Sequence, residues 1–194
     1  MLRRVRVWTG VLLACGLSCA VLAAAEEKTK EVEAGEIKLQ VPESWKAAER
    51  LRTFRIAEFA IPARKGEKEM DAELIVFHFG PEGGGGIDDN IERWKKTFDE
   101  KGREMKVTQG SSEQGKYVFL ELSGTYNKSV GPPVLGRTEK MPNSRGLFVI
   151  LSSKNSGNYF IRLTGADGLV KSSSESFRKS FGGDASKEEE YKSK

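Results

Sequence analysis

The stretch 83–98, which reads GGGGIDDNIERWKKTF, limits the possible folds more than any other part of the chain. Four of its apolar side chains fall at helical spacing and share one face of a predicted helix over residues 87–98: Ile87, Ile91, Trp94 and Phe98. A helix with a single apolar stripe is stable only when that stripe lies against another element. Residues 169–181 repeat the same spacing, although one position is only Ser174. We therefore expect two amphipathic helices, each covering part of a sheet.

Several other segments have the alternation or the continuous apolar character of β-strands. They cover residues 37–41, 53–61, 74–79, 105–112, 116–126, 146–152 and 158–164. A bulge near Ile56 and Ala57 would reconcile the two apolar phases of the second segment. The last two segments flank the turn SSKNSGN, which predicts a hairpin. We predict an α+β fold: a mostly antiparallel sheet of about six strands with a helix on each face, which is a three-layer α/β/α sandwich.

The first 25 residues have the layout of a secretory signal peptide. Arg3, Arg4 and Arg6 precede an apolar stretch, and a run of three alanines follows it before Glu26. The apolar stretch is shorter than the ~20 residues that a spanning helix needs, so we expect no membrane span after cleavage. We predict an exported protein, periplasmic or extracellular. The alternative is a lipoprotein anchored through Cys15 or Cys19.

Cleavage would change the charge and the cysteine content of the chain. Both cysteines lie in the removed segment, so the mature protein would have no disulfide and no thiolate ligand. The 32 basic residues would lose three arginines and become 29, against 28 acidic residues, which gives a net charge of +1. A nearly neutral chain gives no electrostatic support for a nucleic-acid partner, so we predict none.

Composition sets the expected limits of the folded part. Residues 26–36 are charged and nearly free of apolar side chains, so we predict a flexible linker there. Residues 37–182 are expected to form one domain, and residues 183–194 a disordered polar tail. We expect a monomer.

A resemblance to a known group covers about residues 36–182. It is carried by the segments IKLQVPESWK, FRIAEFAIP, IDDNIERWKKTF and LELSGTY, followed by LFVIL and NYFIRLTG before a closing helix. In this order they resemble an uncharacterised group of secreted bacterial proteins. Their element order is similar to the PsbP-like fold, the α/β/α sandwich of an extrinsic photosystem subunit and of a Ran-binding import factor. The resemblance implies a non-enzymatic accessory role and assigns no functional residue.

Three features suggest chemistry but have simpler structural explanations. The four glycines at 83–86 precede a helix start, where phosphates often bind, but Asp88 and Asp89 in its first turn would repel an anion. His78 is the only histidine, and after cleavage the mature chain has no second histidine or cysteine to share a metal with it. The acids at the helix start lack the spacing of a calcium-binding loop. We predict no catalytic residue, no metal and no cofactor.

Residues 126–145 remain as the candidate site. This segment is rich in proline, shows little periodicity and is long for a loop, and long loops tend to be functional or disordered. Its basic residues outnumber its single acid, Glu139, by four to one. We predict that it contacts an acidic partner or anionic surface through Tyr126, Lys128, Arg137, Lys140 and Arg145. A solvated connection is the alternative.

Three functions remain open from the sequence alone. The first is an exported, non-catalytic binding or accessory protein of the cell envelope that acts through protein or surface contacts. The second is a small-ligand or anion-binding protein that uses the loop and the glycine turn. The third is a hydrolase built on His78 and carboxylates. An enzyme needs convergent polar groups in a cleft, whereas a ligand binder needs a concave apolar pocket.

Overall fold

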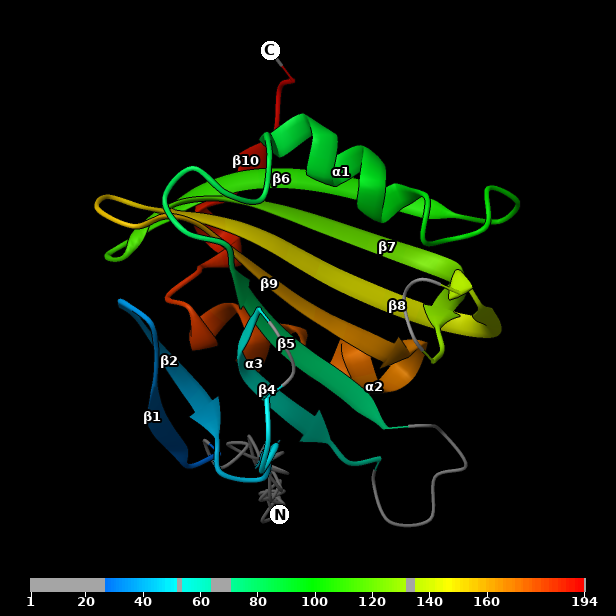
Figure 1. The fold of residues 1–194 in the computed structure, drawn as a ribbon, viewed down its shortest axis with the longest axis horizontal. Helices are drawn as coiled ribbons and strands as arrows, with labels where there is room; N and C mark the ends of the chain where they lie inside the picture. Colours follow the sequence, from blue (N-terminus) through cyan, green and yellow to red (C-terminus); the bar gives the residue numbers. More distant parts are fainter. Residues whose placement is uncertain (1–26, 52–53, 64–70, 132–134, 194) are drawn as a thin grey trace, which may run out of the picture.

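A computed structural model describes residues 27–51, 54–63, 71–131 and 135–193 of the chain (Figure 1). The expected signal peptide lies outside the described residues. Within them no helix is both long enough and apolar enough to cross a bilayer.

A single eight-stranded antiparallel sheet forms the centre of the molecule, so the prediction of about six strands was wrong. Its order is β10 (Glu189–Glu190), β6 (Glu104–Ser112), β7 (Gly115–Ser129), β8 (Thr138–Ser153), β9 (Gly157–Ala166), β5 (Ala72–His78), β4 (Arg55–Ile61) and β3 (Lys46–Ala47). The two additional strands lie at the edges and have two residues each, which is too short for a periodic signal. The register shift between Arg55 and Ala57 confirms the predicted bulge.

One face of the sheet carries α1 (Ile87–Lys95). Ile91 and Phe98 are buried there with Leu120, and the Trp94 ring stacks on Phe148 with 5.0 Å between ring centroids. The predicted helix over residues 87–98 is therefore confirmed except for its last turn. We call this side of the sheet the α1 face.

The opposite face is covered by two short helices, α2 (Asp167–Ser172) and α3 (Ser174–Ser180) (Figure 1). The second predicted helix is thus divided at Ser173. Phe177 and Phe181 are fully buried on this side, and Phe177 packs edge-on against Phe119 of the sheet. The side chains on this face form the larger of the two cores.

Two segments predicted to lack structure are ordered. Residues 26–36 contain β1 (Thr29–Ala34), which pairs with β2 (Ile37–Pro42) in a separate hairpin. Its charged side chains alternate with Val32 and Ala34, which pack into the larger core, so the linker prediction was wrong. Residues 183–194 contain a 3-10 turn, η2 (Ala185–Lys187), and β10. The buried Glu188 carboxylate and the partly buried Tyr191 ring hold this tail in place, against the prediction of disorder.

Candidate functional site

Helix α1 covers only part of its face of the sheet. It lies over β7 and β8, while β9, β5 and β4 remain uncovered by a helix on that side (Figure 1). Cross-strand partners project to the same face, so Arg162 of β9 and Glu58 of β4 share this face with Ile75 of β5. The uncovered strands therefore present both aromatic and charged side chains beside the helix.

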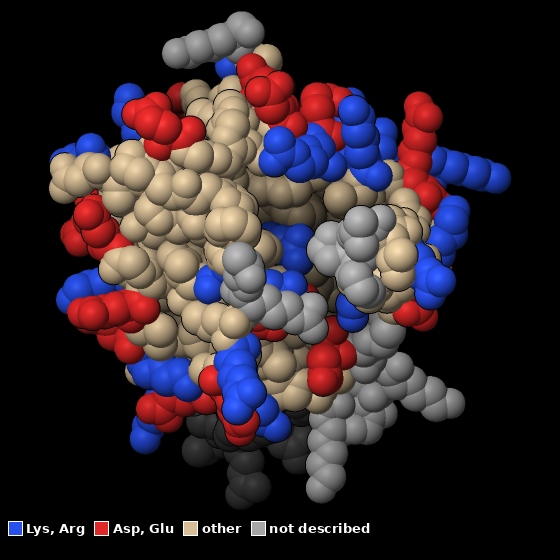
Figure 2. Space-filling model, viewed as in Figure 1, with Lys and Arg blue, Asp and Glu red and all other residues tan. Residues whose placement is uncertain are grey.

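A recess of about 160 Å³ opens between α1 and these strands. Its lining contains four aromatic side chains, two arginines and an asparagine: Phe77, Phe79, Phe160, Trp94, Arg93, Arg162 and Asn90. Figure 2 shows a hollow near the middle of this view with Lys or Arg atoms at its bottom. We call this feature the aromatic recess.

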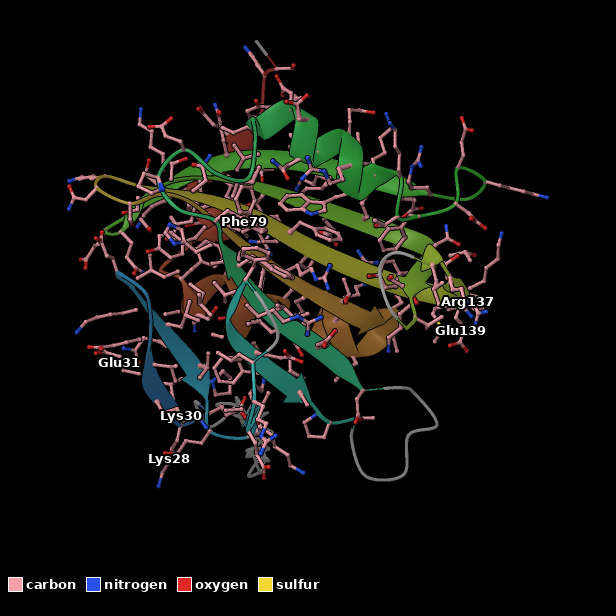
Figure 3. All side chains as sticks on the ribbon, in the orientation of Figure 1. Lys28, Lys30, Glu31, Phe79, Arg137 and Glu139 are labelled. Carbon is pink, nitrogen blue, oxygen red and sulfur yellow. The ribbon has the colours of Figure 1, made fainter. Side chains whose placement is uncertain are left out.

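Phe79 forms the outer rim of the aromatic recess (Figure 3). It is 42% exposed, and its ring centroid lies 5.5 Å from that of Phe54 and 5.7 Å from that of Phe160. Trp94 meets Phe160 edge-on at 6.3 Å. Aromatic rings therefore follow one another from the exposed rim to the wall formed by α1.

The glycine turn before α1 fits closely against this aromatic wall. Gly84 has φ of +89°, and a Cβ atom there would lie 2.3 Å from the Phe160 ring, so both backbone and space require glycine. Asn90 is 2% exposed, and its Nδ2 donates to the carbonyls of Gly84 and Gly86 at 2.8 Å each. The turn is thus fixed by hydrogen bonds and positions one side of the recess.

Arg162 is the cation at the base of the aromatic recess. Its guanidinium lies over the Phe77 ring, 5.0 Å from the centroid. Its Nε is buried and has no hydrogen-bond partner within the described part of the chain, where Arg162 also makes no ion pair. Arg93, by contrast, donates to Asn90 Oδ1 at 2.9 Å. A buried donor on a cation that lacks an acceptor is unfavourable unless something else fills that role.

The two carboxylates on the same face are held by a different arginine. Arg55 Nη1 lies 2.7 Å from Glu58 and 3.3 Å from Glu73. The Glu58 contact is an ion pair without hydrogen-bond geometry, because the same Oε2 atom is buried with no hydrogen bond. These acids therefore neutralise Arg55 and do not pair with Arg162.

A second, larger groove of about 970 Å³ lies where the start of α1 meets the C-terminal tail. Its charges are mixed, with Asp88, Asp89 and Glu189 facing Lys116, Lys187 and Lys192. Asp88 accepts hydrogen bonds from the Tyr191 hydroxyl at 2.9 Å and from Ser193 at 3.1 Å. Burial, and next the bond to Asp88, raise the pKa of Tyr191. This acid therefore fixes the tail in place.

His78 lies on the opposite face from Phe77 and Phe79. It stacks on Tyr159 with 4.4 Å between centroids, and its Nε2 is 2.7 Å from the carbonyl oxygen of Ser156, so this nitrogen donates. No carboxylate hydrogen-bonds to His78 in the described structure. The same residues contain no group of three histidine, cysteine or acidic side chains arranged to hold a metal.

The predicted site at residues 126–145 is not a long loop. β7 and β8 continue as a paired hairpin, with Tyr126 opposite Met141 and Lys128 opposite Glu139; residues 132–134 lie outside the described residues. Arg137 and Glu139 lie near the hairpin end, where Figure 3 labels them. The loop prediction was wrong because the β7–β8 pairing continues beyond a register shift between Gly124 and Tyr126.

The structure also separates the five residues predicted for this site. Tyr126 packs on Phe98 at 5.1 Å, and Lys140 pairs with Asp99 at 2.7 Å. This bond to Lys140, followed by that to Asn127, lowers the pKa of Asp99. Arg145 is 14% exposed and pairs with Asp167 and Glu121. Only Lys128 and Arg137 of the predicted cations make no ion pair within the described residues.

Sequence reasoning missed the aromatic recess because its walls come from β5, α1 and β9, which are far apart in the chain. One signal was available: Arg162 is a single cation inside the otherwise apolar strand YFIRLTG, in phase with Phe160. A charged residue on a sheet face that is otherwise apolar indicates an incompletely covered face or a specific partner.

Comparisons with known proteins show only low similarity. No family model matches the sequence, and no similar sequence was found among curated proteins. The solution structure of cyanobacterial PsbP (CyanoP) from Synechocystis sp. PCC 6803 is 14% identical, with a TM-score of 0.44. The match covers 94% of this chain and 100% of that chain. The family resemblance stays a prediction, and the function is proposed from the aromatic recess alone.

Proposed function

We propose that the protein is a non-catalytic binding protein that holds a small ligand in the aromatic recess. The observation that carries this proposal is Arg162, a half-buried cation whose Nε is buried without a hydrogen-bond partner in the described chain, set among aromatic rings. Concave sites with apolar walls and few polar groups are typical of ligand binding. Of the functions left open by the sequence, the recess therefore supports the small-ligand binder. Export and an envelope partner remain predictions.

The chemistry of the lining supports binding rather than catalysis. Its seven side chains are phenylalanine, tryptophan, asparagine and arginine. General acid–base and nucleophilic catalysis use groups such as imidazole, carboxylate, hydroxyl or thiol, and this lining contributes none of them. The hydrolase hypothesis also required His78, which lies on the other face and donates to a main-chain carbonyl.

A fragment screen by NMR tests the proposal, with small acids, bases and neutral ring compounds in one library. We expect some fragments to shift the indole signal of Trp94, which lines the recess. The indole of Trp45 is an internal control, because Trp45 is 3% exposed and lies in the core behind the sheet. A library in which no fragment shifts Trp94 without Trp45 would contradict the proposed function.

A further inference from the structure

The charges and dimensions of the aromatic recess indicate which class of ligand it binds. This inference rests on the function proposed above. We infer that the recess binds a singly charged carboxylate carried on one planar ring. In this arrangement the carboxylate accepts from the Arg162 guanidinium, and the ring lies among Phe79, Phe160 and Trp94.

Arg162 favours a carboxylate because of its shape as well as its charge. Guanidinium groups present parallel N–H donors that match the two oxygens of a carboxylate. The Arg162 Nε–H is buried, whereas the two terminal nitrogens of the guanidinium are neither buried without a partner nor bonded to any described residue, so a ligand oxygen can accept from them without displacing a protein contact. Arg93 lines the same recess and adds a second positive charge near the ligand.

The neighbouring acids favour a single negative charge on the ligand. The recess lining contributes Arg93 and Arg162, and Arg55, Glu58 and Glu73 form an ion-pair cluster on the neighbouring strands, so these five described residues carry three positive and two negative charges, or +1. A ligand with one negative charge neutralises this net charge of the five residues. A dianion such as a phosphate monoester adds a second charge that the two carboxylates repel.

The volume and the walls restrict the body of the ligand. Pockets for drug-sized molecules enclose roughly 300–1,000 Å³, so a recess of about 160 Å³ accommodates one ring and a small acid group. Aromatic side chains prefer edge-on or offset contacts with other rings. Phe160 and Trp94 already meet edge-on, and the exposed Phe79 ring is available at the rim.

Benzoate, a carboxylate on one planar ring, is the probe for the inferred ligand class. Benzamide, which has nearly the same size and shape but no charge, is the control compound. The protein is titrated with each compound while NMR follows the Trp94 indole and the Arg162 Nε–Hε signals. We expect benzoate to shift both signals and to bind at least about tenfold more tightly than benzamide, because the hydrogen bond is made to a charged acceptor. Phenyl phosphate and acetate are the further probes, expected to bind more weakly than benzoate.

Substitutions of Arg162 test the contact directly. Arg162→Gln is expected to weaken benzoate binding about tenfold or more and to leave benzamide binding nearly unchanged. Arg162→Lys retains the charge without the planar donor fork and is expected to recover only part of the loss. Arg137→Gln, at the exposed end of the β7–β8 hairpin, is the matched control and should leave both affinities unchanged.

Each outcome separates the ligand class from the proposed function. If benzamide binds as tightly as benzoate, or phenyl phosphate binds more tightly, the inferred class is wrong although the recess still binds ligands. If benzoate shifts no Arg162 signal, or Arg162→Gln leaves its affinity unchanged, the inferred contact is wrong. If Arg162→Gln does not fold, the comparison of benzoate with benzamide in the unaltered protein still decides.

Discussion

At the scale of single residues, two arginines of the sheet illustrate why local sequence does not predict electrostatic roles. Arg145 belongs to the segment predicted to bind a partner, yet Asp167 and Glu121 neutralise it inside the fold. Arg162 received no prediction and makes no ion pair in the described chain. The two arginines differ in their neighbours on adjacent strands. Arg145 lies opposite Ser123, close to Glu121, whereas Arg162 lies between the apolar Phe148 and Ile75.

The residue on which the C-terminal tail most depends is Glu188, whose side chain is 4% exposed. It accepts from Arg178 Nε and from the Thr108 hydroxyl, each at 2.8 Å. The Arg178 guanidinium in turn lies 3.8 Å from the centroid of the Phe119 ring. Removing the carboxylate leaves a largely buried cation without its counter-ion, so we expect Glu188→Ala to lower the free energy of unfolding by about 3 kcal/mol.

Urea denaturation measures this loss, and Glu190→Ala is the control. Glu190 is exposed in β10, so its substitution should change the free energy of unfolding by less than about 0.5 kcal/mol. Equal effects of the two substitutions would show that the tail contributes little to stability.

At the scale of elements, the structure departs from the sequence predictions where strands are short or mostly polar. β10 owes its order to β6, about 80 residues away in the chain, whereas β1 pairs with the adjacent β2 and places Val32 and Ala34 in the larger core. The backbone N–H of Tyr191 also donates to the carbonyl of Val107, which continues the contact along β6. Neither element could be predicted from its own residues, because β10 pairs with a distant strand and the apolar side chains of β1 are buried by a core that distant strands build.

The turn η2 gives a prediction for pH dependence. Its N-cap Asp184 accepts from the side chain of Ser186, bonds to Lys187 and accepts from the backbone N–H of Ser186, which together lower the pKa of Asp184 from 3.8 to about 2. A lowered folded-state pKa stabilises the cap above pH 3.8, and this contribution is lost as the pH falls through about 2. We therefore expect the tail to loosen only near the lower value.

An NMR titration of the Ser186 backbone N–H checks this expectation. Its chemical shift should follow the ionisation of Asp184, with a midpoint near 2. In Asp184→Ala the same signal should lack this transition at every pH. A midpoint at the ordinary value of 3.8 would show that the cap does not form in solution.

At the scale of the whole molecule, the two cores share the strands that separate them. In β8, Leu147, Val149 and Leu151 face the larger core, whereas Phe148 faces α1. The same hydrogen-bonded strands therefore carry the side chains of both cores, one core on each face of the sheet. Loss of either core removes support from the other, so we expect the described domain to unfold as one cooperative unit.

Two tryptophans report on the two cores separately. Trp45 is buried in the larger core, and Trp94 belongs to α1 and packs against the smaller core. Two double variants each keep one of these tryptophans: Trp8→Phe with Trp45→Phe keeps Trp94, and Trp8→Phe with Trp94→Phe keeps Trp45. The fluorescence of the remaining tryptophan follows one core, and far-UV circular dichroism follows the sheet. We expect the fluorescence and dichroism midpoints in urea to coincide within each variant. A Trp94 transition that precedes the dichroism change would indicate that α1 detaches first.

The fold was more predictable than the site. The stripe of Ile87, Ile91 and Trp94 predicted α1, and the apolar phases around Ile56 predicted the bulge, because both signals reside in consecutive residues. The aromatic recess required Phe77, Trp94 and Arg162 to meet from three elements. No periodicity within one segment specifies such a meeting.

The sequence by itself therefore determined the α+β class and its main helices and strands, since side-chain spacing fixes which faces must be buried. Tertiary structure alone decided the strand order, the pairing of Arg145 and the isolation of Arg162. The physical reason is that burial of a side chain follows from its own segment, whereas its charge partners come from segments that the fold brings together.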